Sequence, residues 1–206
     1  QFHLISFDDP EGDGIPNGQA SVHLSGFGIE DTHAVANSLR WGPDGWLYGC
    51  QGFATRSTVG KPADGGKILR KGDPFPVEMP VKDGQYIDGG VWRYHPTKDR
   101  FEVVAHGFSN PWGMDFDDHG QIFITACVIP HLWHVIPGGI YHRQGGSHIN
   151  PYVFDDIKTI ADHRHWVGDI GDNQDSWPEV RLHRAADECG AVHDRGDLLQ
   201  PLANLH

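Results

Sequence analysis

The chain has 206 residues, enough for one domain with a hydrophobic core, and it combines 27 Gly and 14 Pro with 7 Trp and 10 Phe. Disordered chains lack such aromatics, and a formal net charge of -12 argues against the basic face that a nucleic-acid partner requires. No apolar run approaches the roughly 20 residues that span a bilayer. The three scattered cysteines and the lack of a C-x-x-C-H motif argue against a disulfide scaffold and against c-type haem in this segment. This composition favours a turn-rich β protein that handles a neutral small molecule.

Alternating apolar residues between short turns predict strands along the chain up to residue 146. Period-2 strands joined by turns that contain Gly, Asp or Pro are typical of an antiparallel meander. The expected hairpins pair residues 2–7 with 20–24, 39–41 with 46–49, 91–94 with 100–104, 114–116 with 121–124, and 132–136 with 140–142.

An internal repeat makes the fold prediction more specific. Residues 39–48 superpose on residues 114–123 at a constant offset of 75 residues, and residues 24–27 match residues 105–108. This period exceeds the ~40–50 residues of a β-propeller blade, so we expect an insertion at residues 53–90. The repeat predicts an all-β fold, an incomplete β-propeller of two to three antiparallel blades with a short helical tail. A single β-sandwich with accidental similarity is the alternative.

The pattern changes after residue 155. Residues 1–155 are predicted to form the blades, and residues 156–206 an irregular segment with a short helix that starts at the capping box 176–179 and ends at Gly190. The chain opens on Gln1 inside a predicted strand, so we expect a fragment of a larger propeller. Unpaired blade faces would leave five aromatic side chains partly exposed: Trp41, Tyr48, Trp92, Phe116 and Trp133.

An acidic turn near the start of the chain has the composition of a calcium loop. Asp9, Glu11 and Asp13 alternate ahead of Gly14, which matches the first half of such a loop. Ala20 stands where the twelfth position usually supplies a bidentate carboxylate. The turn therefore predicts either a calcium site or an acidic hairpin tip without an ion.

Two histidine pairs are further candidates for metal binding. His163 and His165 would share a face of an extended segment, whereas His131 and His134 would need a turn to converge, because odd spacing alternates faces of a strand. Hydrogen bonding between blades is the alternative role for these four side chains.

Three segments resemble a known family. They read G-F-G-I-E-D-T-H-A-V-A-N-S-L-R-W-G-P-D-G-W-L-Y-G at residues 26–49, N-P-W-G-M-D-F-D at 110–117 and A-D-H-R-H-W at 161–166. They are similar to the membrane-bound dehydrogenase domain family of large bacterial proteins, and the first also resembles a blade of the soluble quinoprotein glucose/sorbosone dehydrogenases. The resemblance covers about residues 1–170. It implies a propeller fold, a periplasmic or exported location, and a c-type haem domain of the parent protein as electron acceptor.

The same resemblance implies an oxidoreductase that acts on a sugar or alcohol with pyrroloquinoline quinone and Ca²⁺. His33 matches the general base that removes the substrate's hydroxyl proton, and an imidazole that titrates near neutrality suits this role. Three residues match cofactor-contacting positions: Asn37, Asn110 and Trp112.

The chain departs from the glucose enzymes at two positions. His33 lies one residue further from Leu39 than in those enzymes, and Ser109 stands where they have an Arg that binds the quinone carboxylates. Loss of a bidentate cation weakens the binding of a tricarboxylated quinone. Three other arginines could replace it: Arg40, Arg56 and Arg143.

Two other functions stay open. Ser109 favours a catalytically silent propeller that binds carbohydrate or protein partners. The structural alternative for His33 is a buried histidine that bonds the connecting loop through Glu30 or Asp31. A propeller hydrolase or lactonase would need acidic and amide ligands. The candidates for those ligands are Asp31, Asn37, Asn110 and Asp115.

Overall fold

The computed structural model describes residues 2–68, 71–74, 80–127, 129, 132–143, 145–146, 148 and 150–160. These residues form eleven β-strands and no helix, so the all-β prediction is confirmed for them. The same residues therefore contain no helix long and apolar enough to cross a membrane. The predicted helix at 176–189 lies outside the described residues.

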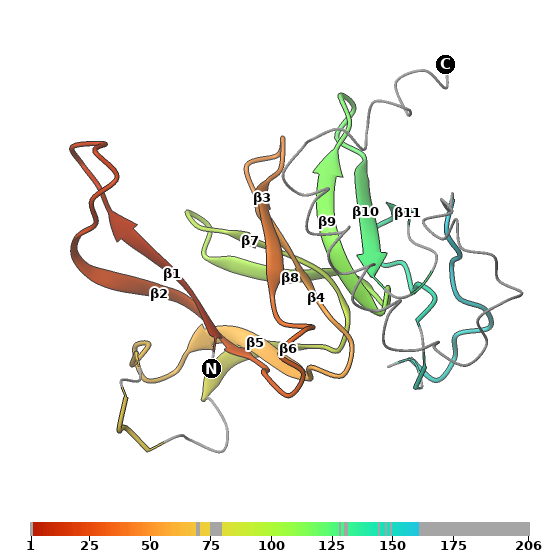
Figure 1. The fold of residues 1–206 in the computed structure, drawn as a ribbon, viewed down its shortest axis with the longest axis horizontal. Helices are drawn as coiled ribbons and strands as arrows, with labels where there is room; N and C mark the ends of the chain where they lie inside the picture. The colour runs from red at the N-terminus through yellow and green to blue at the C-terminus, as the bar shows by residue number, and fades with distance from the viewer. Residues whose placement is uncertain are drawn as a thin grey trace, which may run out of the picture.

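The strands form three antiparallel sheets, which lie side by side with sheet 2 in the middle (Figure 1). Sheet 1 has the order β1 (Phe2–Asp8), β2 (Asn17–Phe27), β5 (Ser57–Pro62) and β6 (Val81–Ile87). Sheet 2 has the order β3 (Asn37–Trp41), β4 (Leu47–Gln51), β7 (Gly90–His95) and β8 (Arg100–His106). Sheet 3 contains β9 (Asn110–Phe116), β10 (Ile122–Cys127) and β11 (Leu132–Val135), with β10 in the centre.

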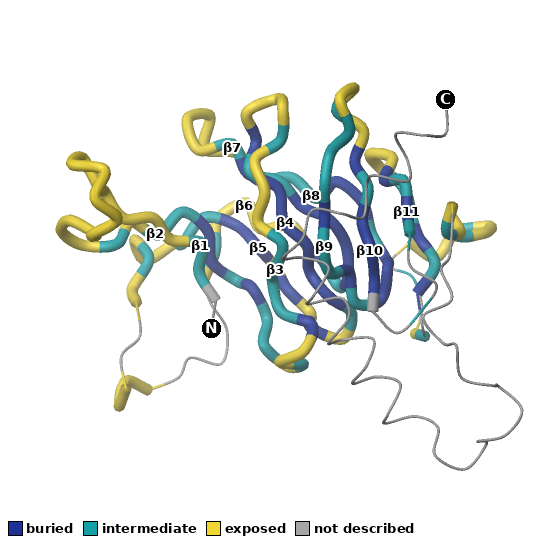
Figure 2. The backbone as a smooth tube through the Cα atoms, turned by 45° about the horizontal axis from the view of Figure 1, so that its top comes forward, coloured by how far each residue is buried: buried dark blue, intermediate teal, exposed yellow. Residues whose placement is uncertain are grey.

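Sheet 2 is covered on both faces. Successive residues of a strand point to opposite sides, so neighbouring residues of β7 join different hydrophobic clusters. Val91 packs in a cluster with side chains of sheet 3, including Met114 and Trp133, whereas the adjacent Trp92 packs in a second cluster with Leu24 of sheet 1. The buried stretches of the backbone accordingly run through the strands where the sheets face one another (Figure 2). Full burial of side chains of this size contributes about 1.5–3 kcal/mol each.

The expected insertion at residues 53–90 is confirmed and contains a hairpin. β5 and β6 lie between β4 and β7 in the sequence, yet β5 pairs with β2 of the neighbouring sheet through Ser25 and Gly60. Sheet 2 therefore remains a meander whose second hairpin simply resumes after the insertion.

The repeat at an offset of 75 residues is confirmed at the level of strand register. Trp41 pairs with Leu47 in the β3–β4 hairpin, and the residues 75 positions later, Phe116 and Ile122, pair in the β9–β10 hairpin. The turns also match, because the backbone N–H of residue 42 bonds to the carbonyl of residue 46, and that of residue 117 to the carbonyl of residue 121. The two hairpins thus occupy equivalent places in neighbouring sheets.

The shorter match, residues 24–27 with 105–108, is also confirmed. Between β1 and β2 the register shifts where the pairs change from Leu4–Leu24 to Ile5–Val22, and between β7 and β8 it shifts at the equivalent pairs. The equivalent pairs in sheet 2 are Val91–Ala105 and Trp92–Val103. A β-bulge at the same place in both hairpins makes β1–β2 of sheet 1 equivalent to β7–β8 of sheet 2.

One expectation is wrong, and another is wrong in part. Residues 140–142 do not pair with β11, because Ile140 forms a parallel bridge to His106 at the end of β8, and Gly138 donates a hydrogen bond to Val104. The backbone of this turn therefore forms its hydrogen bonds with β8 of sheet 2 and not with β11. Of the five aromatics expected to be partly exposed, Tyr48, Trp92 and Trp133 are buried, because the sheets cover one another. The expectation holds for the other two, since Phe116 is only partly buried and Trp41 is exposed.

Candidate functional site

The loops that leave and enter the sheets at one end are tied together by their backbones. Gly52 N donates to Ala34 O at 2.8 Å, Phe53 N to Ser109 O at 2.6 Å, and Gly107 N to Gly89 O at 2.9 Å. These bonds join the segments 28–36, 52–56, 88–89 and 107–109, which we call the loop end. It is the end at which β4, β6 and β8 finish and β3, β7 and β9 begin.

His33 lies on the first of these segments with its side chain 90% exposed. Its backbone N–H donates to Asp31 Oδ1 at 2.9 Å, and its ring Nδ1 lies 3.3 Å from the same oxygen. The carboxylate thus holds the ring in a turn and leaves the other ring nitrogen, Nε2, toward solvent. This arrangement suits a proton acceptor that a carboxylate orients.

Asn110 is brought to this histidine from 77 residues away. Its side-chain Nδ2, at the first position of β9, donates to His33 O at 3.1 Å. Its Oδ1 is buried and has no hydrogen-bond partner among the described residues. An unpaired buried acceptor costs about 1–3 kcal/mol, so a hydrogen-bond donor would be stabilised at this position.

A second Asp-His turn, at the opposite end, shows what is particular to His33. His119 lies two residues after Asp117, and its backbone N–H donates to Asp117 Oδ1 at 2.9 Å. The ring lies 3.9 Å from the carboxylate and is also exposed. The turn alone is therefore a local motif. His33 differs from His119 in that its ring is within hydrogen-bond distance of the carboxylate and its backbone accepts the hydrogen bond from Asn110.

The other two predicted cofactor-contacting residues are held by local bonds. Asn37 begins β3; its Nδ2 donates to Val35 O at 2.9 Å and its Oδ1 accepts from Ser38 at 2.7 Å. Trp112 is half-buried in β9, and its carbonyl accepts a hydrogen bond from the Thr125 hydroxyl. Both residues lie in the strands that lead away from the His33–Asn110 contact.

Ser109 and the three candidate arginines do not form a cationic clamp that fits a tricarboxylated quinone. Ser109 is 1% exposed, and its neutral hydroxyl cannot replace the expected cation. Arg143 is buried with its guanidinium 3.2 Å from Asp88 and stacked 4.3 Å from the Phe53 ring. Arg40 is paired with Asp115 at 2.6 Å. Both cations are already engaged by carboxylates of the chain, and the third candidate, Arg56, is a single exposed side chain.

The predicted calcium turn uses its carboxylates for its own structure. Asp9 accepts hydrogen bonds from the backbone N–H groups of Gly12, Asp13 and Gly14 at 2.8–3.2 Å. Glu11 accepts one from Asn17 at 2.9 Å. Within the described part of the chain, no group of three or more His, Cys, Asp or Glu side chains is placed to hold a metal ion.

Of the four histidines considered for metal binding, the structure describes one. His134 lies on β11, where its Nε2 donates a hydrogen bond to Gln121 Oε1 at 2.8 Å and its ring stacks on Phe123 with a centroid distance of 5.1 Å. His131, His163 and His165 lie outside the described residues.

Sequence reasoning missed a charged cluster next to the loop end. Asp156 lies 3.0 Å from His142 Nδ1 and 3.3 Å from His148 Nε2, and it also contacts Lys158. Burial lowers the pKa of His148, and the nearby positive charges of Arg143, His142 and Lys158 lower it further. Only tertiary contact joins these residues, since no spacing rule relates them.

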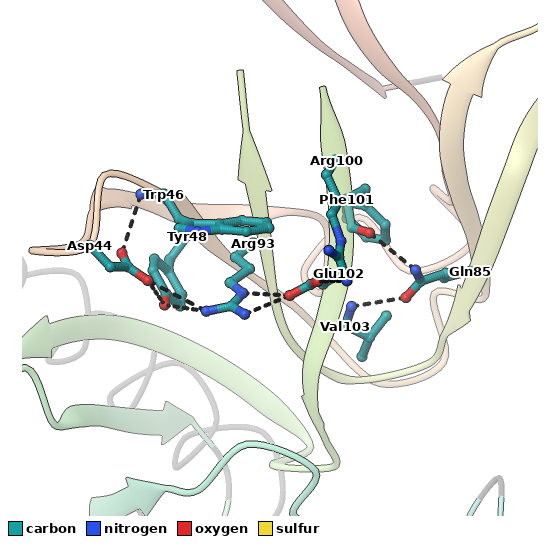
Figure 3. Close-up of polar contacts among 9 residues, drawn as sticks. All are labelled: Asp44, Trp46, Tyr48, Gln85, Arg93, Arg100, Phe101, Glu102 and Val103. Atoms are coloured by element: carbon teal, nitrogen blue, oxygen red, sulfur yellow. Dashed lines mark hydrogen bonds and ion pairs between the residues drawn. The ribbon is translucent and has the colours of Figure 1, made fainter. Parts of the chain in front are cut away.

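A second network that the sequence did not reveal lies on sheet 2 (Figure 3). Arg93 donates to Glu102 Oε2 from two nitrogens, at 2.8 and 2.6 Å, and approaches Asp44 at 3.4 Å. Its guanidinium also lies 4.2 Å from the centre of the Trp46 ring. The network joins β7, β8 and the turn between β3 and β4, and it stabilises the sheet.

The fold and the site define an all-β protein of stacked antiparallel sheets with a polar, histidine-bearing loop end. The chain belongs to the family described as "Domain of unknown function (DUF7133)", whose model matches residues 2–199. No curated protein and no solved structure matches the chain.

Proposed function

We propose that this chain is a segment of a β-propeller from an oxidoreductase that acts on a sugar or alcohol, with His33 as general base. The propeller is supported by the two register-matched repeats and by the stacking of three antiparallel sheets. A periplasmic or exported location, suggested by the family resemblance, belongs to the same proposal.

One observation carries the catalytic part of the proposal. His33 is exposed, its ring is oriented by Asp31, and its backbone carbonyl is hydrogen-bonded to Asn110 of a second sheet. A side chain on a loop between strands gains precision when a neighbouring element fixes its backbone. The contact with Asn110 supplies this support, and it joins two residues that the resemblance had placed in one site.

The chemistry assigned to this chain is the movement of one proton. His33 Nε2 accepts the proton of a substrate hydroxyl, and Asp31 stabilises the resulting imidazolium through Nδ1. Positioned bases contribute roughly 10²–10⁴-fold to such steps. Oxidation of the alcohol also removes a hydride from its carbon. The proposal assigns this hydride to a two-electron acceptor bound by the parent protein, from which a c-type haem domain would take the electrons one at a time.

The decisive experiment measures dye reduction by the intact parent protein with a panel of sugars and alcohols. We expect His33→Ala to lower the rate at least about 100-fold with an unchanged melting temperature. His119→Ala is the matched control, because it removes an exposed histidine from the same kind of turn. Equal effects of the two variants, or a stable and fully active His33→Ala protein, would refute the assignment.

A second candidate function, a non-catalytic module that binds carbohydrate or protein, is favoured by the arginines. Because Arg40 and Arg143 are paired with carboxylates and Ser109 is buried, these positions offer no cationic pair for the quinone within the part of the chain that the structure describes. We therefore test the parent protein with and without added pyrroloquinoline quinone and Ca²⁺. Saturable sugar binding without dye reduction under either condition would establish the binding module instead.

A further inference from the structure

Among the described strands, β1 is an edge strand of sheet 1, whereas its equivalent in the internal repeat is an inner strand of sheet 2. β1 is equivalent to β7, and β7 is paired on both sides, by β8 and by β4. β1 pairs only with β2 among the described strands. Ile5 and Phe7 of β1 are 42% and 47% exposed, although they are equivalent to the buried Trp92 and Tyr94.

A second exposed surface points to the same missing element. Leu39 and Trp41 of β3 are 55% and 60% exposed, but the residues 75 positions later, Met114 and Phe116, pack against sheet 2. Phe116 meets the Tyr48 ring edge-on at 5.0 Å, and β9 lies against both β3 and β4. Leu39 and Trp41 are therefore exposed because none of the described strands in sheet 1 is a counterpart of β3 and β4 that could pack against them.

The two exposed surfaces continue one established interface. The cluster between sheets 1 and 2 contains Leu24 and Trp92, and Leu4 of β1 and Ala36, just before β3, are partly buried against it. Beyond these two residues the interface ends, and β1 and β3 both become exposed (Figure 2). Between sheets 2 and 3, the corresponding place is filled by the β3–β4 hairpin of sheet 2, which packs against β9.

We propose that β1, Leu39 and Trp41 form one docking surface for a β-hairpin of a partner polypeptide. The hairpin's second strand pairs antiparallel with β1, as β4 pairs with β7. It carries an aromatic side chain, at the place of Tyr48, against the Trp41 ring. This proposal does not depend on the catalytic role of His33.

The repeat also supplies the probe, because residues 35–52 of this chain are the equivalent hairpin. We add this segment as an unlabelled peptide to the isotope-labelled protein, and in a second protein attach it ahead of Gln1 through a Gly/Ser linker, which raises its effective concentration to about millimolar. We expect the β1 amides that face away from β2 to exchange at least about tenfold more slowly. The indole N–H resonance of Trp41 should shift in the same samples.

Matched variants separate docking from a general effect. Ile5→Lys and Trp41→Ala should abolish the protection, whereas Ile136→Ala, which removes an exposed apolar side chain at the end of β11, should not. A peptide with Tyr48→Ser should protect less than the native peptide. The proposal is overturned if even the tethered hairpin leaves β1 unprotected. Protection of β1 by concentration-dependent self-association without peptide also overturns it, because the occupant is then a second copy.

Discussion

Replacing Arg93 by Ala should destabilise the fold by about 2–3 kcal/mol. The variant loses two charge-assisted hydrogen bonds to Glu102, together worth about 1.5–3 kcal/mol, and a cation–π contact with Trp46 worth about 0.5–2 kcal/mol. Because the Arg93 side chain is 30% exposed and Glu102 is 22% exposed, solvent screening reduces their sum. For a chain of this size, the melting temperature should fall by about 5–10 °C.

Denaturant unfolding of Arg93→Ala, monitored by tryptophan fluorescence, measures this loss directly. Arg100→Ala is the control, because Arg100 also contacts Glu102, at 2.6 Å, but its side chain is 67% exposed. The control should cost no more than about 1 kcal/mol. A change below about 0.5 kcal/mol for Arg93→Ala, or equal changes for the two variants, would show that the network contributes nothing specific.

Two further predictions test the backbone and the pH dependence. Gly107→Ala should lower the free energy of unfolding by about 2–4 kcal/mol, because φ is +111° and the added Cβ would collide with the carbonyl oxygen of Tyr141. Gly45→Ala, at a φ of +79° with open space around the Cβ, should cost only about 1–2 kcal/mol by the same denaturant assay. Similar costs for the two variants would contradict the steric argument. Burial lowers the pKa of His106 below its usual 6.5, so the unfolded chain binds the proton first, and stability present above about pH 6.5 is lost as the pH falls. Unfolding free energies measured between about pH 7.5 and 5.5 should fall less steeply in His106→Asn than in the unchanged protein, and an equal slope would exclude His106 as the source.

The sequence by itself determined the strands, the turns and the repeat. Four of the five expected hairpins form, because period-2 alternation and the Gly- and Asp-containing turns act within a few residues of one another. The offset of 75 residues also identified equivalent positions before any contact was known, since equal patterns fold into equal registers. The same reasoning located the insertion between β4 and β7.

The tertiary structure alone decided which surfaces meet. Alternation shows that Trp92 and Val91 face opposite ways, but not that both faces are covered. It also does not reveal that the inserted hairpin joins sheet 1, or that residues 140–141 bridge to His106 instead of pairing with β11. These choices depend on backbone hydrogen bonds between segments far apart in the chain, and no local pattern encodes their partner.

The contacts of the candidate site are likewise of two kinds, those local in sequence and those that depend on how the sheets pack. The turn that joins Asp31 to His33 is local. The expected contact with Asp31 forms, but the burial expected in that alternative is wrong, because the His33 side chain is 90% exposed. The bond from Asn110 spans 77 residues and exists only because two sheets meet at the loop end. The pairing of Arg143 with Asp88 is likewise tertiary, and it decides that this arginine is not available to an anionic cofactor. Local spacing determines which side chains a loop can offer, and the packing of sheets determines what each of them can bind.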